Sequence, residues 1–349
     1  MFIATQSQFA LALADIRVGA WSLHLWPTLA WQEIKQRYRR SLLGPFWLTI
    51  STALFIAGMG PLYGALMGQP ASQYIHFLAV GFIVWQFISG LITEGCQAFI
   101  AAEGFIKQTR LPLTVHALRV VWRNVLILAH NFIIVILVSA YFLPSWNWGL
   151  LTVPAGISVI ALNGLWLGLL LGLLSARFRD IPQIVTSLVQ LLFFVTPIFW
   201  RPEMLTTNKW VADWNPIFHL IELVRAPILG QPFPAASWQV AIVVTAGGWL
   251  VALVSAALPH GAAPAIDAGV LATVRTSVLA AAALALAWAG RHDRFREAGW
   301  LLYPLLAAGG LKLLVEDLPR SRPATLFIAL ALYGGALILA PRLGRPRSR

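Results

Sequence analysis

The sequence predicts an all-α integral membrane protein, and three observations support this fold class. Hydrophobic residues make up 59% of the chain and charged residues 11%, whereas soluble domains average about 25% charged residues. Apolar runs of the length that crosses a bilayer as a helix, about 20 residues, recur along the chain. Basic residues gather in alternate connections between these runs. Because so few charges cannot cover a water-soluble surface, the chain must face lipid.

Six runs are expected to span the membrane as one helical bundle within residues 46–258. They lie at about 46–67, 74–93, 118–143, 150–175, 181–200 and 238–258. Residues 1–45 form a segment before the bundle, expected on the cytoplasmic side. Residues 259–349 are rich in Ala, Leu and Arg and contain two or three further apolar runs. Of 16 tryptophans only Trp288 and Trp300 lie in this last part, so we interpret it as an appended hydrophobic module.

The basic residues predict the orientation of the bundle. The segment before the first run is rich in Lys and Arg, and the connection between the second and third runs carries Lys107, Arg110, Arg119 and Arg123, whereas residues 68–73 and 144–148 carry no charge. Basic loops stay on the cytoplasmic side of a membrane, so the N-terminus is expected there. The net charge of +12 follows from this topology and does not require a nucleic-acid partner.

Residues 28–43 are expected to form a basic helix in the cytoplasmic membrane interface. Trp31, Ile34, Tyr38 and Leu42 recur at steps of three and four, with mostly polar and basic residues between them. One apolar stripe on a basic helix suits a position between lipid and water. The following Gly44 and Pro45 should break this helix before the first span.

Residues 201–237 are too long for a tight turn and too apolar for a free loop. Prolines interrupt helix formation here, so short helices partly inserted at the outer face are expected. Glu222 and Arg225 are three residues apart and can pair on one helical face. Charges at membrane depth are costly, which favours either this pairing or contact with a watery vestibule.

The chain lacks the common catalytic signatures, so no catalytic residue, metal site or cofactor is predicted. It contains no G-x-x-x-x-G-K-[ST], H-E-x-x-H or G-x-S-x-G motif. A single cysteine, Cys96, excludes an intramolecular disulfide. The pair His130–Asn131 could serve as a relay, but bonding to a neighbouring helix is the more common role.

Four segments in a fixed order carry a resemblance to a known family. They are YRRSLLGPFW at 38–47, SARFRDI at 175–181, FFVTPIFW at 193–200, and WNP at 214–216 followed by RAPILG at 225–230. Together they resemble the ABC-2 type permeases, most of all those that export O-antigen polysaccharide, capsule or teichoic acid. The similarity covers about residues 21–258, and the region beyond it departs from the family pattern.

The resemblance implies a permease in the cytoplasmic (inner) membrane that works as a homodimer around a central channel. Its substrate would be a lipid-linked glycan, and a separate ABC ATPase subunit would bind the ATP. In the family that subunit docks on a short helix between the second and third spans. The matching residues here are Glu103, Phe105, Lys107 and Arg110. An ordinary solvated loop is the alternative interpretation of the same residues.

Three further groups of residues are assigned expected roles in such a permease. Arg37, Arg39 and Arg40 would attract the pyrophosphate of the substrate at the cytoplasmic leaflet, or serve topology only. Aromatic rings inside the spans would stack on sugar rings along the channel, or simply form a membrane-interface belt; they are Phe55, Tyr63, Phe193 and Phe194. The outer gate would be formed by Asn215, Pro216, Glu222 and Arg225.

Two other function classes stay open on the sequence alone. A multispan enzyme acting on a polyprenyl-linked sugar would need acidic or histidine residues in an outer loop. Such residues are present as Glu203, Asp213, His219 and Glu222. A passive channel or membrane scaffold is the third class. The ordered segments favour the permease.

Overall fold

The computed structural model describes residues 8–39, 41, 43–44, 46–109, 111–142, 148–205 and 209–257, and the isolated positions 306, 333 and 334. Every regular element among these residues is a helix, which confirms the all-α class. The chain divides into two compact units, residues 1–258 and 259–349. The elements below belong to the first unit, and the predicted C-terminal helices lie outside the described residues.

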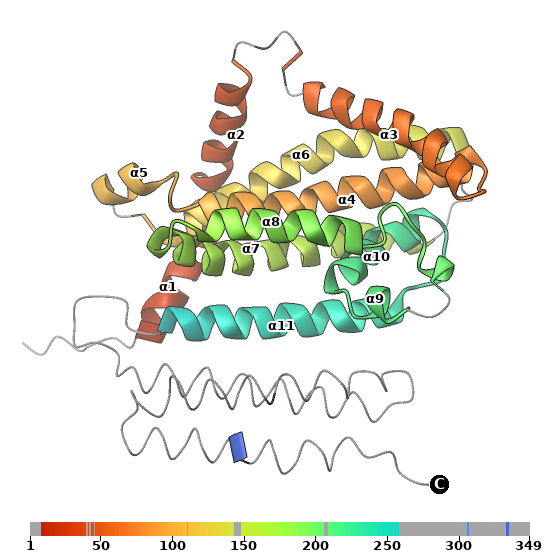
Figure 1. Ribbon diagram of the computed structural model, residues 1–349. Helices are drawn as coiled ribbons and strands as arrows, with labels where there is room; N and C mark the ends of the chain where they lie inside the picture. Colours follow the sequence, from red (N-terminus) through yellow and green to blue (C-terminus); the bar gives the residue numbers. More distant parts are fainter. Residues whose placement is uncertain are drawn as a thin grey trace, which may run out of the picture. The chain divides into compact units, whose positions relative to one another are not determined.

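Five helices among the described residues are long and apolar enough to cross a bilayer. They are α3 (Phe46–Leu66), α4 (Ala71–Gln97), α6 (Leu113–Phe142), α7 (Val153–Arg177, preceded by the 3₁₀ helix η1, Trp148–Thr152) and α11 (Ala235–Ala257). α4 lies at the centre and contacts α3, α6, α7, α8 and α10 (Figure 1). Glycines allow α4 and α7 to approach closely, since a Cβ on Gly95 would lie 3.0 Å from the Cα of Gly168.

The fifth predicted span, at 181–200, is shorter than expected, so the six-helix count is not confirmed. α8 (Ile181–Val195) has 15 residues, or about 22 Å at 1.5 Å per residue, less than the roughly 30 Å of a hydrocarbon core. It ends where Thr196 takes an extended conformation before Pro197. Proline disfavours a helical conformation in the residue before it, and this explains the early end.

Short helices follow α8, as expected for residues 201–237. They are the 3₁₀ helix η2 (Pro202–Met204), α9 (Trp210–Asp213) and α10 (Pro216–Ile228). Asn215 caps α10, because its side chain accepts hydrogen bonds from the backbone N–H groups of Ile217 and Phe218. α10 packs against α4, α7 and α11, and most of its residues are buried.

Two helices precede the bundle. α1 (Gln8–Trp21), which the sequence did not lead us to expect, packs on α6 and α11. α2 (Trp26–Arg37) corresponds to the predicted interfacial helix but ends before Tyr38. Its Ala30 and Ile34 are buried and it packs on α6, while Trp31 is about half exposed. The apolar stripe therefore faces protein in part, which ties α2 to the bundle.

Polar side chains inside the bundle bond between helices. Asn131 on α6 donates to Gln86 on α4 at 3.0 Å, which confirms the expectation for this residue. His130 instead contacts the Leu126 carbonyl of its own helix at 2.8 Å. Asn163 on α7 donates to the Thr245 hydroxyl of α11 at 2.7 Å. Such bonds satisfy polar groups that lipid cannot.

Candidate functional site

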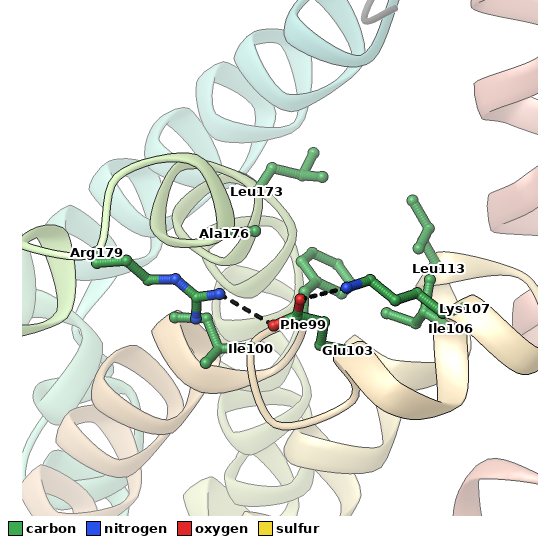
Figure 2. Close-up of a pocket in the computed structure, with 9 residues that line it drawn as sticks. All are labelled: Phe99, Ile100, Glu103, Ile106, Lys107, Leu113, Leu173, Ala176 and Arg179. Atoms are coloured by element: carbon green, nitrogen blue, oxygen red, sulfur yellow. Dashed lines mark hydrogen bonds and ion pairs between the residues drawn. The ribbon is translucent and has the colours of Figure 1, made fainter.

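The short helix α5 (Glu103–Gln108) lies in the connection between α4 and α6, where the docking helix was expected. Glu103 accepts from Lys107 Nζ at 2.7 Å and from Arg179 Nη2 at 3.0 Å (Figure 2). Arg179 belongs to the connection between α7 and α8. One carboxylate thus joins α5 to the connection that leads into α8. The hydrogen bond from Lys107, and then that from Arg179, lowers the pKa of the Glu103 carboxyl.

A cavity of about 280 Å³ lies beside this pair. Its wall includes the apolar side chains of Phe99, Ile100, Ile106, Leu113 and Leu173, and Glu103, Lys107 and Arg179 also line it (Figure 2). Phe105 is 46% exposed, and its ring meets that of His116 edge-on at 6.1 Å. Arg110 lies outside the described residues. α5 thus presents charged and aromatic groups next to a small apolar hollow.

An ionic cluster, formed by Glu33, Arg37, Glu94, Arg119 and Arg123, joins α2, α4 and α6. Arg119 Nη1 lies 2.9 Å from Glu33 Oε1. Arg123 bonds both carboxylates, including Glu94 Oε2 at 2.8 Å from its Nη2. The Arg119 and Arg123 side chains are only 12% exposed, and the two carboxylates 25–28%. Among the described residues of the bundle, the ionic cluster is the largest group of paired charged side chains.

The sequence reasoning missed the ionic cluster as a unit. It assigned Arg119 and Arg123 to topology and gave no role to Glu33 or Glu94. A signal was available, since a lone glutamate near the end of an apolar run must find a partner, and arginines four apart share a helical face. Asp15 was missed as well: both its carboxylate oxygens accept from the first N–H groups of α6, at 2.9 and 3.0 Å.

Of the three arginines expected at substrate entry, two can be placed. Arg37 ends α2, is half exposed and lies 3.7 Å from Glu94. Arg39 follows α2 and is exposed. Arg40 lies outside the described residues. The ionic cluster therefore shares Arg37 with the predicted entry group.

The four predicted channel aromatics lie in one aromatic cluster, which three further rings complete. Its members are Phe55, Tyr63, Phe82, Trp85, Phe193, Phe194 and Phe199. Phe55 stacks on Phe82 with centroids 4.4 Å apart. Phe199 lies 5.0 Å from Phe193 and 5.4 Å from Tyr63. The sequence predicted two rings on α3 and two on α8, but not the α4 rings and the Phe199 ring after α8 that connect them.

Two of the four predicted gate residues are buried in protein. Arg225 is 1% exposed and pairs with Glu222, as expected from their spacing. Asn215 is 6% exposed and donates to the Thr196 hydroxyl at 2.9 Å. Pro216 is exposed at the start of α10, and Glu222 is partly exposed. Of the two arrangements expected for these charges at membrane depth, the structure therefore shows the ion pair between Glu222 and Arg225.

Several long apolar helices, a basic helix beside them and a short charged helix between two spans define a multi-span helical membrane protein. Residues 24–229 match the model of the ABC-2 type transporter family, and the chain belongs to that family.

The chain is similar to curated members of this family. Two O-antigen export system permease proteins RfbA from Klebsiella pneumoniae are 27% and 26% identical to it over 199 residues, which cover 54% of this chain and 74% of theirs. The RfbA protein of Myxococcus xanthus is 27% identical over 216 residues, 60% of this chain and 82% of its own.

Proposed function

We propose that this chain is the permease subunit of an ABC exporter that moves a lipid-linked polysaccharide of the O-antigen class across the cytoplasmic membrane. The observation that carries the proposal is the family match over residues 24–229, together with relatives named as O-antigen export permeases. In this proposal the N-terminus is cytoplasmic and the energy comes from a separate ABC ATPase.

The surface of α5 supports docking of that ATPase. Glu103 and Lys107 of α5 and the neighbouring Arg179 have side chains that are 47%, 71% and 59% exposed. An exposed phenylalanine, Phe105, and the apolar cavity of about 280 Å³ stand beside them. Charged groups around an apolar centre are the usual anatomy of a protein interface. α5 would then pass movement of the ATPase to the bundle.

The aromatic cluster supports a glycan as the cargo. Aromatic faces bind sugar rings through the C–H edges of the sugar, which holds a glycan without gripping it tightly. Phe194 is 71% exposed at one side of the cluster. The same face of α8 exposes Ile184, Leu188 and Leu191. In a homodimer, a second copy facing α8 would enclose the exposed rings in a channel.

Arg37, Arg39 and Arg40 would attract the pyrophosphate of the lipid carrier at the cytoplasmic leaflet. Each such charge near an anionic surface contributes about 1 kcal/mol. The ionic cluster would support this group by holding α2 against α4 and α6.

No observation favours an enzyme acting on polyprenyl-linked sugars. His219 contacts the Asp213 carbonyl at 2.8 Å and the Ser237 hydroxyl at 3.0 Å, and Glu222 pairs with Arg225. The side chains of His219 and Glu222 are thus engaged in holding the helices of this segment. Among the described residues, no three His, Cys, Asp or Glu side chains are grouped to hold a metal.

Co-purification tests the proposal. The tagged chain should bring down an ABC ATPase from its native host, and lipid-linked polysaccharide should stimulate ATP hydrolysis by the reconstituted complex. Absence of any ATPase would refute the permease assignment. An ATPase that responds equally to carrier lipid with and without the glycan would refute the assigned cargo.

A further inference from the structure

The backbone that ends α8 is held by side chains from two other helices. Arg225 of α10 donates from Nη1 to the Pro197 carbonyl at 2.7 Å. Tyr74 of α4 donates from its hydroxyl to the Phe199 carbonyl at 2.6 Å. Asn215, the cap of α10, donates to the Thr196 hydroxyl at 2.9 Å. Ile198, between these anchor points, is fully buried.

Arg225 makes the most contacts of these side chains. Besides Pro197, it donates from Nε to Glu222 Oε1 at 2.7 Å. Its guanidinium lies over the Phe77 ring, 4.3 Å from the centroid. A planar fork of five donors can bond a carboxylate and a carbonyl at once, whereas a lysine ammonium cannot span the same two acceptors in this geometry.

The space for this guanidinium depends on a glycine of α4. A Cβ on Gly81 would lie 3.2 Å from Arg225 Nη1, the nitrogen that bonds Pro197. An alanine at position 81 would crowd the Arg225 Nη1 nitrogen without changing the charge of the guanidinium. The hydrogen bond from Arg225 to the Pro197 carbonyl is therefore sensitive to a substitution on α4, a helix that carries neither of these two residues.

The held segment carries a ring that joins the two sides of the aromatic cluster. Phe199 lies 6.3 Å from Phe55 and 5.4 Å from Tyr63 on α3, and 5.0 Å from Phe193 on α8. Its backbone is two residues from the Pro197 carbonyl that Arg225 holds. We therefore expect a shift of that carbonyl to move the Phe199 ring relative to its three neighbours, with the Tyr74 bond to the Phe199 carbonyl as the second anchor.

We infer that Arg225 is a positioning residue: by bonding the Pro197 carbonyl it sets Phe199 within the aromatic cluster, so that α10 determines the geometry of the surface along which the cargo moves. The part about cargo rests on the proposed function. In this proposal Arg225 does not contact the glycan. Its role therefore differs from that of a gate residue that lines the exit of the channel.

The test compares Arg225→Lys and Gly81→Ala with Arg201→Lys. Arg201 is a matched control, because its guanidinium also lies over Phe77, 5.0 Å from the centroid. A 4-fluorophenylalanine at position 199 reports ring position through its ¹⁹F chemical shift in the purified protein. Export of lipid-linked polysaccharide is measured separately in cells that carry each variant.

Arg225→Lys and Gly81→Ala should each move or broaden the ¹⁹F resonance and lower export about tenfold, as expected for the loss of one buried hydrogen bond, and Arg201→Lys should do neither. An unchanged resonance in folded Arg225→Lys and Gly81→Ala would overturn the positioning role. A moved resonance with normal export would overturn its link to cargo movement. If the unsubstituted chain exports no polysaccharide, the proposed function fails, while the ¹⁹F result still decides the positioning role.

Discussion

Replacing Arg123 with methionine is expected to lower the free energy of unfolding by about 3 kcal/mol. Arg123 is the one member of the ionic cluster that bonds both Glu33 and Glu94. Methionine keeps much of the volume but removes every donor. Glu33 would then keep Arg119, and Glu94 would keep Arg37 at 3.7 Å and the amide of Asn124.

The magnitude follows from the burial of the three groups. Removing one partner of a fully buried ion pair costs roughly 3–5 kcal/mol, whereas an exposed pair contributes about 0–1 kcal/mol. Arg123 is 12% exposed, but its carboxylate partners are 25–28% exposed and each keeps a second donor. Solvent screening of the carboxylates therefore places the loss near the lower end of the buried range.

Reversible unfolding in detergent micelles, followed by tryptophan fluorescence, measures this loss. Lys107→Met is the matched control, because Lys107 also pairs with a glutamate but is 71% exposed. Removing Glu94 as well, in Glu94→Gln with Arg123→Met, should cost less than the sum of the single changes, because no unpaired charge is left on α4. A loss below about 1 kcal/mol for Arg123→Met, or an equal loss for Lys107→Met, would show that the ionic cluster contributes little to the bundle.

Three further predictions concern the side of the bundle that is proposed to be cytoplasmic. Neutralising Arg37, Arg39 and Arg40 together should reduce export while membrane insertion, measured by fractionation, stays normal; unchanged export would leave these arginines a topological role only. Reversing the charge of Glu103 or Lys107 should uncouple ATP hydrolysis from transport, and unchanged ATPase association and transport in both variants would remove α5 as the docking helix. The pKa of Glu103 is lowered in the folded state, so its contribution to stability is present above the unfolded value of about 4.3 and is lost as pH falls through the folded value. The melting temperatures of the unsubstituted chain and Glu103→Gln should therefore differ at neutral pH and converge in acid, and a constant difference across that range would contradict the assignment.

The apolar runs predicted most helices to within a few residues, because a span must be both long and apolar. Where prediction and structure differ, the length and apolar composition of a run were given more weight than local signals. The run at 181–200 was taken as one span although Pro197 interrupts it, and α8 ends at Val195. α1 was not expected, because its 14 residues are too few to attract attention as a span. It is held by Asp15, which caps a helix that begins 98 residues later.

The candidate site was predictable only where its residues are close in sequence. The pair of Glu222 and Arg225 follows from helical spacing alone. By contrast, Arg123 meets Glu94 and Glu33 across separations of 29 and 90 residues, which periodicity cannot reveal. The aromatic rings were selected one by one from the spans, and only the packing of α3 and α8 on either side of α4 shows that Phe82 and Phe199 connect them.

α4 contributes to each of three features: the bonds that hold the segment after α8, the aromatic cluster and the ionic cluster. A single helix therefore links the parts of the proposed function. Its first turns carry Tyr74, which holds the Phe199 carbonyl; its middle carries Phe82 in the aromatic cluster; its last turns carry Glu94 in the ionic cluster. The 20 residue steps from Tyr74 to Glu94 span about 30 Å as a helix, which is about the thickness of a hydrocarbon core. The chain reaches α5 five residues after α4 ends. One largely buried helix therefore connects the surface proposed for ATPase docking with the segment proposed to position the aromatic rings, so displacement of α5 and rearrangement of those rings would act on the same element.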